Sequence, residues 1–373
     1  MILLAIFLDL FGFGMLIPDI QFRAERLGMT GWEIGAALTT TFVIQFVVSP
    51  LWGRASDRLG RKPILLACAA LSASGLFTYG IATLPIVIVI SRVLSGFGGA
   101  NVSIAQAYMA DRSTSAGRTG AMGRIGAAVS AGLIAGPASL SLPALRHINV
   151  GLTAGMLSAA GVVALLFLPA GAPVTTGEPE RKPIFDFSLL RTLPALRSLV
   201  IVAAVAWFSL AMLEGTFGRL IERTLGFHRL EFGRVFALEA VVGVVAQGLI
   251  LAWLAKRTRP DPRLRISYLL QGAGLALTPY VLNLPSLFGV SALYALGSAV
   301  ANGTVNGLCS LATPEDRQGE LFGLLQGARS VGFAIGPILG GIVFDLRPQA
   351  PYLLAGGTCL AAAILVRLPR VPT

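Results

Sequence analysis

The sequence contains few charged side chains. Only 13% of its 373 residues are Asp, Glu, Lys or Arg, whereas 55% are hydrophobic, and the mean hydropathy is +0.77. A soluble domain carries roughly 25% charged residues, because its surface must be in contact with water. The composition therefore excludes a soluble globule and predicts a chain whose solvent is lipid.

Cysteine and histidine are also scarce. The three cysteines, Cys68, Cys309 and Cys359, lie in apolar runs without any C-x-x-C spacing, and His147 and His228 are far apart. This pattern supports neither a disulfide framework nor a zinc site, so we predict no metal and no cofactor. The spans predicted below also contain no His pair, no carboxylate pair at helical spacing and no activated nucleophile. An enzyme is therefore not expected, and we predict no catalytic residues.

The chain nevertheless has a net charge of +11. Its Lys and Arg residues lie in short turns between apolar runs and form no basic stripe, so nucleic acid is not an expected partner. The basic residues are enriched in alternate turns, beginning with residues 53–62. Because positive charge collects on the cytoplasmic side of a membrane, we expect a multi-pass protein of the inner (cell) membrane with both termini in the cytoplasm.

Twelve apolar runs are long enough for membrane spans, each of which needs about 20 residues as a helix. The first run begins at Ile2 and is longer than the core of a cleaved signal peptide, so we interpret it as the first span. The predicted spans are residues 2–22, 31–52, 63–83, 85–109, 120–142, 150–169, 196–218, 230–254, 264–282, 285–311, 319–344 and 350–368.

One long polar segment, residues 170–195, divides these spans into two sets of six. We therefore predict an N-terminal six-helix bundle over residues 1–169, a cytoplasmic linker, and a C-terminal six-helix bundle over residues 196–373. The fold class is an all-α membrane protein whose two bundles are related by a pseudo-two-fold axis.

An internal repeat supports the two bundles. Sliding the sequence by 200 positions places the Gly-x-x-x-Gly-Pro of span 5 on that of span 11. Small residues four apart let helices pack closely, and Pro bends them; generic tight packing is the alternative to a transport-specific role. The helix-packing residues predicted from this repeat are Gly132, Gly136, Pro137, Gly336 and Pro337.

Residues 53–62 form a basic interruption between spans 2 and 3. Their sequence, G-R-A-S-D-R-L-G-R-K, resembles the G-x-x-x-D-R-x-G-R-K loop of the major facilitator superfamily. The resemblance implies that Asp57 latches helix 2 to helix 11 in one of two access states. The alternative is a solvated basic turn that only sets topology. The predicted latch residues are Gly53, Asp57, Arg58, Gly60 and Arg61.

Two charged residues within predicted spans are candidates for proton coupling. Asp9 begins D-L-F-G-F-G-M-L-I-P, which is similar to the D-x-x-G-x-G-x-x-x-P of drug and proton antiporters, and Arg92 begins R-V-L-S-G-F-G, which is similar to the R-x-x-x-G-x-G of the same superfamily. An isolated charge in hydrocarbon is costly and marks a transport pathway, unless Asp9 reaches water from the cytoplasmic end. A buried guanidinium needs an anion, and Asp9 is the expected partner of Arg92.

Further polar or aromatic residues within spans are candidates for contact with a substrate. Glu239 and Arg329 lie near mid-depth and are expected either to pair or to bind substrate, whereas Glu214 is expected to reach water at the outer end of span 7. The predicted substrate-cavity residues are Asn101, Gln106, Trp207, Glu239, Asn302 and Arg329.

The resemblance implies a function as well as a fold. Transporters of the major facilitator superfamily have a central cavity between two six-helix bundles, which rock between inward-open and outward-open states. We predict a multidrug efflux or antibiotic resistance protein, a monomer in the lipid bilayer that exports a small amphipathic compound in exchange for protons. The alternative is a proton-coupled importer or facilitator of a sugar or other small metabolite. It stays open because Leu140 and Ser141 replace the glycine pair that ends the antiporter signature in span 5.

Overall fold

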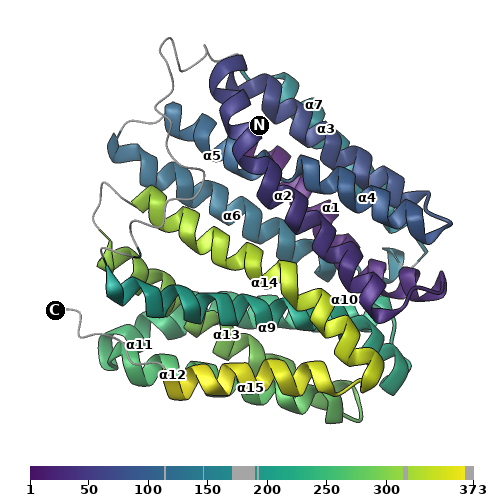
Figure 1. Ribbon diagram of the computed structural model, residues 1–373, viewed down its shortest axis with the longest axis vertical. Coiled ribbons are helices and arrows are strands. Elements are labelled where there is room, and N and C mark those ends of the chain that lie inside the picture. Colours follow the sequence, from purple (N-terminus) through teal and green to yellow (C-terminus); the bar gives the residue numbers. More distant parts are fainter. Residues whose placement is uncertain (113–114, 146, 170–189, 191–192, 314–317, 366–373) are drawn as a thin grey trace. The chain divides into compact units, whose positions relative to one another are not determined.

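The computed structural model describes residues 1–112, 115–145, 147–169, 190, 193–313 and 318–365. These residues are built from helices, with no strand among them (Figure 1), so the predicted all-α fold class is confirmed. Most of the predicted linker, residues 170–189 and 191–192, lies outside the described residues.

Each of the first six predicted spans contains a helix. Span 4 is divided into two helices by the turn residues Gly99 and Ala100. The helices are α1 (Ile2–Arg26), α2 (Gly31–Leu59), α3 (Arg61–Gly80), α4 (Pro85–Gly98), α5 (Asn101–Asp111), α6 (Ser115–Ser139) and α7 (Val150–Leu166), with the short 3-10 helix η1 (Pro143–Leu145) before α7.

The last six predicted spans are helical too. They contain α9 (Pro194–Leu225), α10 (Arg229–Val245), the π-helical turn η2 (Ala246–Ile250), α11 (Leu251–Arg257), α12 (Pro260–Leu277), the 3-10 turn η3 (Thr278–Tyr280), α13 (Leu284–Ala312), α14 (Gln318–Leu346) and α15 (Ala350–Leu365). In the described chain, eight helical segments are long and apolar enough to cross a membrane, and α7 and α15 are shorter apolar helices.

The contacts divide the chain into two compact units. Unit 1 takes in Met1–Met29, Ala36–Arg181 and Phe232–Arg234, and unit 2 takes in Thr30–Gly35, Lys182–Glu231 and Val235–Thr373. Each unit has its own set of packed helices.

In unit 1, α1 packs against α6 and α7, and α3 packs against α4 and α7. Two glycines of α6 lie directly on the α1 backbone. A Cβ atom at Gly132 would come within 2.8 Å of the Phe7 carbonyl oxygen, and one at Gly136 within 2.8 Å of the Met15 nitrogen. Because only glycine allows so close an approach, these two positions determine how near α6 comes to α1.

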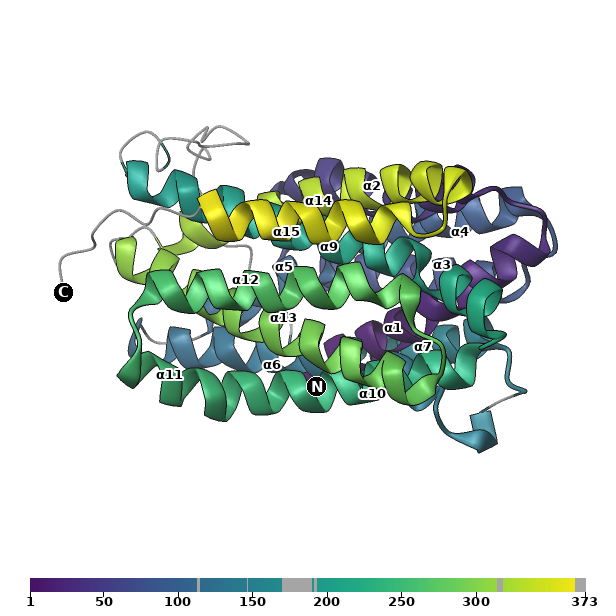
Figure 2. The ribbon, with the colours of Figure 1, turned by 90° about the horizontal axis from the view of Figure 1, so that it is seen from below.

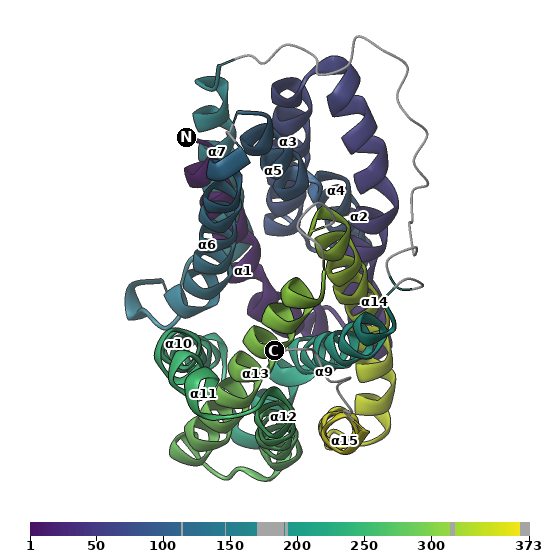
Figure 3. The ribbon, with the colours of Figure 1, turned by 90° about the vertical axis from the view of Figure 1, so that its left-hand side faces the viewer.

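In unit 2, α9 packs against α14, and α12 lies beside both α13 and α15, as Figures 2 and 3 show. The glycines at equivalent positions of the repeat again lie on a helix backbone. A Cβ atom at Gly332 would come within 2.7 Å of the Phe208 nitrogen, and one at Gly336 within 3.0 Å of the Phe208 oxygen. The internal repeat thus corresponds to the same kind of packing, of span 5 on span 1 and of span 11 on span 7.

Residues 53–62 differ from the polar interruption between two spans that the sequence suggests. The helix α2 continues through Gly53 and Asp57 to Leu59, and α3 begins at Arg61. The chain reverses at Gly60, which has φ 94°, a conformation that L side chains rarely adopt. The basic residues are therefore held on helix ends and not on a flexible loop.

Candidate functional site

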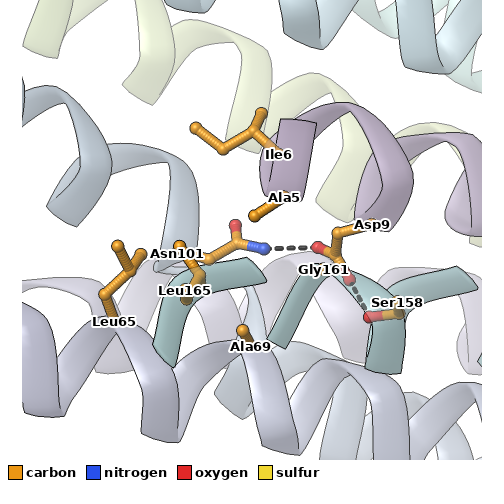
Figure 4. Close-up of a pocket in the computed structure, with 9 residues that line it drawn as sticks. All are labelled: Ala5, Ile6, Asp9, Leu65, Ala69, Asn101, Ser158, Gly161 and Leu165. Atoms are coloured by element: carbon orange, nitrogen blue, oxygen red, sulfur yellow. Dashed lines mark hydrogen bonds between the residues drawn. The ribbon is translucent and has the colours of Figure 1, made fainter. Parts of the chain in front are cut away.

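Asp9 lies at the meeting point of four helices of unit 1. Its side chain on α1 is 5% exposed. Ser72 on α3 and Ser158 on α7 each donate a hydroxyl hydrogen bond to Oδ1, at 2.7 and 2.5 Å, and Asn101 on α5 donates from Nδ2 to Oδ2. Figure 4 shows the Asn101 and Ser158 contacts converging on the carboxyl group. Asp9 is therefore buried in protein and does not face lipid.

The local sequence explains why these donors reach Asp9. Helix α7 is capped by Asn149, whose side chain accepts a hydrogen bond from the Leu152 nitrogen. One turn before Ser158, Ala154 packs on Gly12 so closely that a Cβ atom there would lie 2.8 Å from the Ala154 oxygen. Because α1 has no side chain at Gly12, α7 comes near enough for Ser158 to reach Asp9, one turn away along α1.

The break in span 4 places the third donor. A Cβ atom at Gly98 would come within 2.7 Å of the Cys68 carbonyl oxygen, so the end of α4 lies against α3. The chain then turns at Gly99 and Ala100 and restarts as α5 at Asn101. Because of this break, the end of α4 packs on α3, while Asn101, the first residue of α5, carries the amide that binds Asp9.

A small pocket lies beside the Asp9 carboxyl group (Figure 4). Its polar residues are Asp9, Asn101 and Ser158, and the others are small or aliphatic. The full lining is Ala5, Ile6, Asp9, Leu65, Ala69, Asn101, Ser158, Gly161 and Leu165. Each contact that the structure gives this carboxyl comes from a neutral hydrogen-bond donor, and small or aliphatic residues line the rest of the pocket.

Arg92 does not lie at Asp9. Its side chain on α4 is 1% exposed, with the guanidinium carbon 5.7 Å from the centre of the Tyr79 ring. Tyr79 is seven residues beyond Ser72 on α3, or about 10 Å at 1.5 Å per residue. The described residues contain no ion pair between Asp9 and Arg92, so the structure does not show the expected partnership. The two charges belong to different levels of unit 1.

Asp19, which was not expected as a site residue, shares the Tyr79 side chain with Arg92. The Tyr79 hydroxyl donates a 2.7 Å hydrogen bond to Oδ2 of Asp19, and Arg92 and Arg23 both lie over the Tyr79 ring. Asp19 is 6% exposed. A signal was available, because Asp19 is a second acid in the first apolar run, ten residues after Asp9 and directly after Pro18. Arg92 thus faces Asp19 through an aromatic ring, at the level of Tyr79.

Two of the predicted latch residues, Asp57 and Arg61, take part in an ion-pair network within unit 1. Arg61 contacts Asp57 at 2.6 Å and Asp111 of α5 at 2.9 Å, and it donates to the Ser56 hydroxyl at 2.7 Å. Arg58 is exposed. Asp111 was not expected from the sequence, since it lies 50 residues from Arg61. The network joins the ends of α2, α3 and α5, while the proposed contact of Asp57 with helix 11 stays a prediction.

The charged residues of unit 2 are paired differently from the expectation. Arg329 interacts electrostatically with Glu214 and lies over the Trp207 ring at 4.8 Å. Glu239 accepts a hydrogen bond from Ser291 and lies near Glu214. Glu214, which was expected to reach water at the outer end of span 7, is half-buried and interacts with this guanidinium.

Three other substrate-cavity candidates are placed as follows. The Asn101 side chain donates a hydrogen bond to Asp9. Gln106 is exposed on α5. Asn302 of α13 donates to Ser298, one turn earlier, at 3.3 Å. The structure therefore brings Trp207, Glu239 and Arg329 into one cluster in unit 2, and does not bring Gln106 to the Asp9 site.

Comparisons with known proteins agree with this architecture. The sequence model of the Major Facilitator Superfamily matches residues 2–328 and 264–373. Multidrug resistance protein 2 of Bacillus subtilis (strain 168) is 26% identical over 363 residues, which cover 94% of this chain and 90% of that protein. Tetracycline resistance protein, class D, of Salmonella ordonez is 26% identical over 376 residues, which cover 97% and 95%.

A solved structure gives the same result for the fold. The nucleoside transporter NupG is similar with a TM-score of 0.77, over 97% of this chain and 96% of that one, at 17% sequence identity. At this identity the likeness concerns the fold alone.

Proposed function

Since the chain belongs to the Major Facilitator Superfamily and is a membrane-spanning transporter, not an enzyme, we propose that it exports a small amphipathic organic compound in exchange for protons. The observation that carries the proposal is Asp9, a buried carboxyl inside a membrane span, held by the neutral donors Ser72, Asn101 and Ser158. An acid in this environment changes charge when it takes up a proton, and alternating access carries that proton across the membrane.

The curated relatives support export as the direction. A multidrug resistance protein and a tetracycline resistance protein both match over at least nine-tenths of this chain and of their own length. A transporter that confers resistance to a compound does so by removing it from the cell. We therefore take tetracycline as the first probe, together with other amphipathic compounds that stabilise the purified protein against heat.

The proposal includes an arrangement in the membrane. The transporter is a monomer in the cell membrane, with both termini and residues 170–195 in the cytoplasm and with six-helix bundles over residues 1–169 and 196–373. Asp57 latches one access state, and Arg61 holds Asp57 in place for that contact. The positive-inside pattern and the 2.6 Å contact between Arg61 and Asp57 support this arrangement.

Transport in membrane vesicles tests the proposal. Inverted vesicles with an acidic interior should accumulate tetracycline, and an ionophore that collapses the pH gradient should abolish the accumulation. The Asp9→Asn variant should reach the membrane in normal amount and lose gradient-driven accumulation. Active export retained by that variant would contradict the proposal.

A proton-coupled importer of a small metabolite is the second candidate. It is favoured by the incomplete glycine signature of span 5, where Leu140 and Ser141 stand in place of the glycine pair that span 11 keeps at Gly340 and Gly341. An importer would accumulate its compound in right-side-out vesicles when protons enter. Such accumulation, without export from inverted vesicles, would replace the first proposal by the second.

A further inference from the structure

The cluster in unit 2 contains two carboxylates and one guanidinium. Glu214 is on α9, Glu239 on α10 and Arg329 on α14, and all three side chains are half-buried. Glu214 interacts electrostatically with both of the others. When all three groups are ionised, the cluster has one more negative charge than positive charge.

The positive charge of Arg329 lies beside Glu214. Arg329 interacts electrostatically with Glu214, and its guanidinium carbon lies 4.8 Å from the centre of the Trp207 ring and 5.5 Å from that of Phe333. Both rings offer it a face for cation–π contact. Arg329 is thus held beside one acid, whose charge it neutralises.

Glu239 is supported by neutral groups. Ser291 on α13 donates a hydrogen bond to it, and the buried Tyr294, one turn further along α13, faces both carboxylates. Cys359 of α15 faces Tyr294 in turn. Two carboxylates that share a site of low dielectric repel each other, and one proton on the pair removes the excess charge.

We propose that Glu239 is a second proton-binding acid of the transporter, located in unit 2 and set up by the neighbouring Glu214–Arg329 pair. The transporter then binds one proton in each unit, at Asp9 and at Glu239. This inference rests on the proposed proton coupling, but it concerns proton binding and does not depend on the substrate or on the direction of transport.

Proton binding by the purified protein tests the inference without any substrate. The protein in weakly buffered detergent solution is titrated between about pH 6 and pH 8 with an indicator dye, a range in which carboxyls in water, which titrate near pH 4, stay ionised. Glu239→Gln should bind one proton fewer than the wild type. Arg329→Gln should bind one more, because both carboxylates then lack a positive partner. Glu25→Gln, at the end of α1 and outside the cluster, is the matched control and should bind the same number.

The variants separate this role from a merely structural one. Glu214→Gln should also bind one proton fewer than the wild type, because Arg329 then neutralises Glu239. If these residues only maintained packing, the number of bound protons would not fall when an acid is replaced and rise when Arg329 is replaced. An unchanged count in Glu239→Gln would overturn the inference. If the Asp9→Asn variant keeps gradient-driven export while Glu239→Gln loses one proton, the proposed role of Asp9 fails and the second site stands.

Discussion

The close contact at Gly12 offers a test of how the Asp9 site is assembled. An alanine Cβ atom at this position would lie 2.8 Å from the Ala154 carbonyl oxygen and 3.2 Å from the Ala154 Cα atom. To reach an ordinary contact of 3.4 Å, α1 and α7 must separate by about half an ångström. The atoms in the way are backbone atoms, which cannot turn aside as a flexible side chain would.

The expected cost follows from two opposing effects. Replacing glycine by alanine inside a helix stabilises it by about 1 kcal/mol, because the unfolded chain loses freedom. Overpacking a close contact costs about 1–3 kcal/mol. Gly126 on α6 is the matched control, since nothing lies within 4 Å of an added Cβ atom there. The two variants should therefore differ in unfolding free energy by about 1–3 kcal/mol, with Gly12→Ala the less stable.

Thermal unfolding of the wild type and the two variants in the same detergent ranks their stabilities. Gly126→Ala should melt at or above the wild type, and Gly12→Ala at or below the wild type and below Gly126→Ala. The same shift of α7 moves Ser158 away from Asp9, so Gly12→Ala should also transport more slowly than Gly126→Ala. If Gly12→Ala melts as high as Gly126→Ala, the helices are not held at the distance that the structure gives, and the account of the Asp9 site fails.

Two further predictions concern charge networks in unit 1. Asp19→Asn should lower the melting temperature by removing the anion bonded to Tyr79, over whose ring the buried Arg92 and Arg23 both lie. Adding Arg92→Gln should restore part of the loss, and no recovery in the double variant would show that Asp19 does not balance this charge. Arg61→Gln removes contacts to two acids, Asp57 and Asp111, whose side chains are 40% and 34% exposed, so the expected loss of stability is only about 1 kcal/mol. The Arg61→Gln loss is read from denaturant unfolding, and a loss several times larger would mean that the network holds the helix ends more firmly than surface pairs do.

Local sequence patterns were enough to predict the helices and the class of fold. Each predicted span contains a helix, because about 20 consecutive apolar residues are stable in lipid only when their backbone groups are bonded within the segment. Boundaries were less exact. The polar residues 53–59 were expected outside the helix, yet they continue α2, since charged side chains at a helix end can reach water while the backbone stays helical.

Pairings between distant residues could not be predicted in the same way. Asp9 was recognised from its motif, but Ser72 and Ser158 carry no signal in a chain rich in small residues. Glu214 was expected to reach water from its position along span 7, but that position did not reveal its partner, because the depth of a residue does not tell which face of the helix it occupies. The structure places it opposite Arg329, 115 residues away in sequence.

By itself, the sequence determined that this chain lies in a membrane as a set of helices and that isolated charges within them need partners. Hydropathy and the cost of burying charge act on every segment separately, so one segment is enough to reveal them. Only the tertiary structure decided which partners those charges have. It placed three neutral donors around Asp9, Asp19 near Arg92, and Glu214 at Arg329, because helix rotation and the close approach allowed by glycines such as Gly12 depend on all packed neighbours at once.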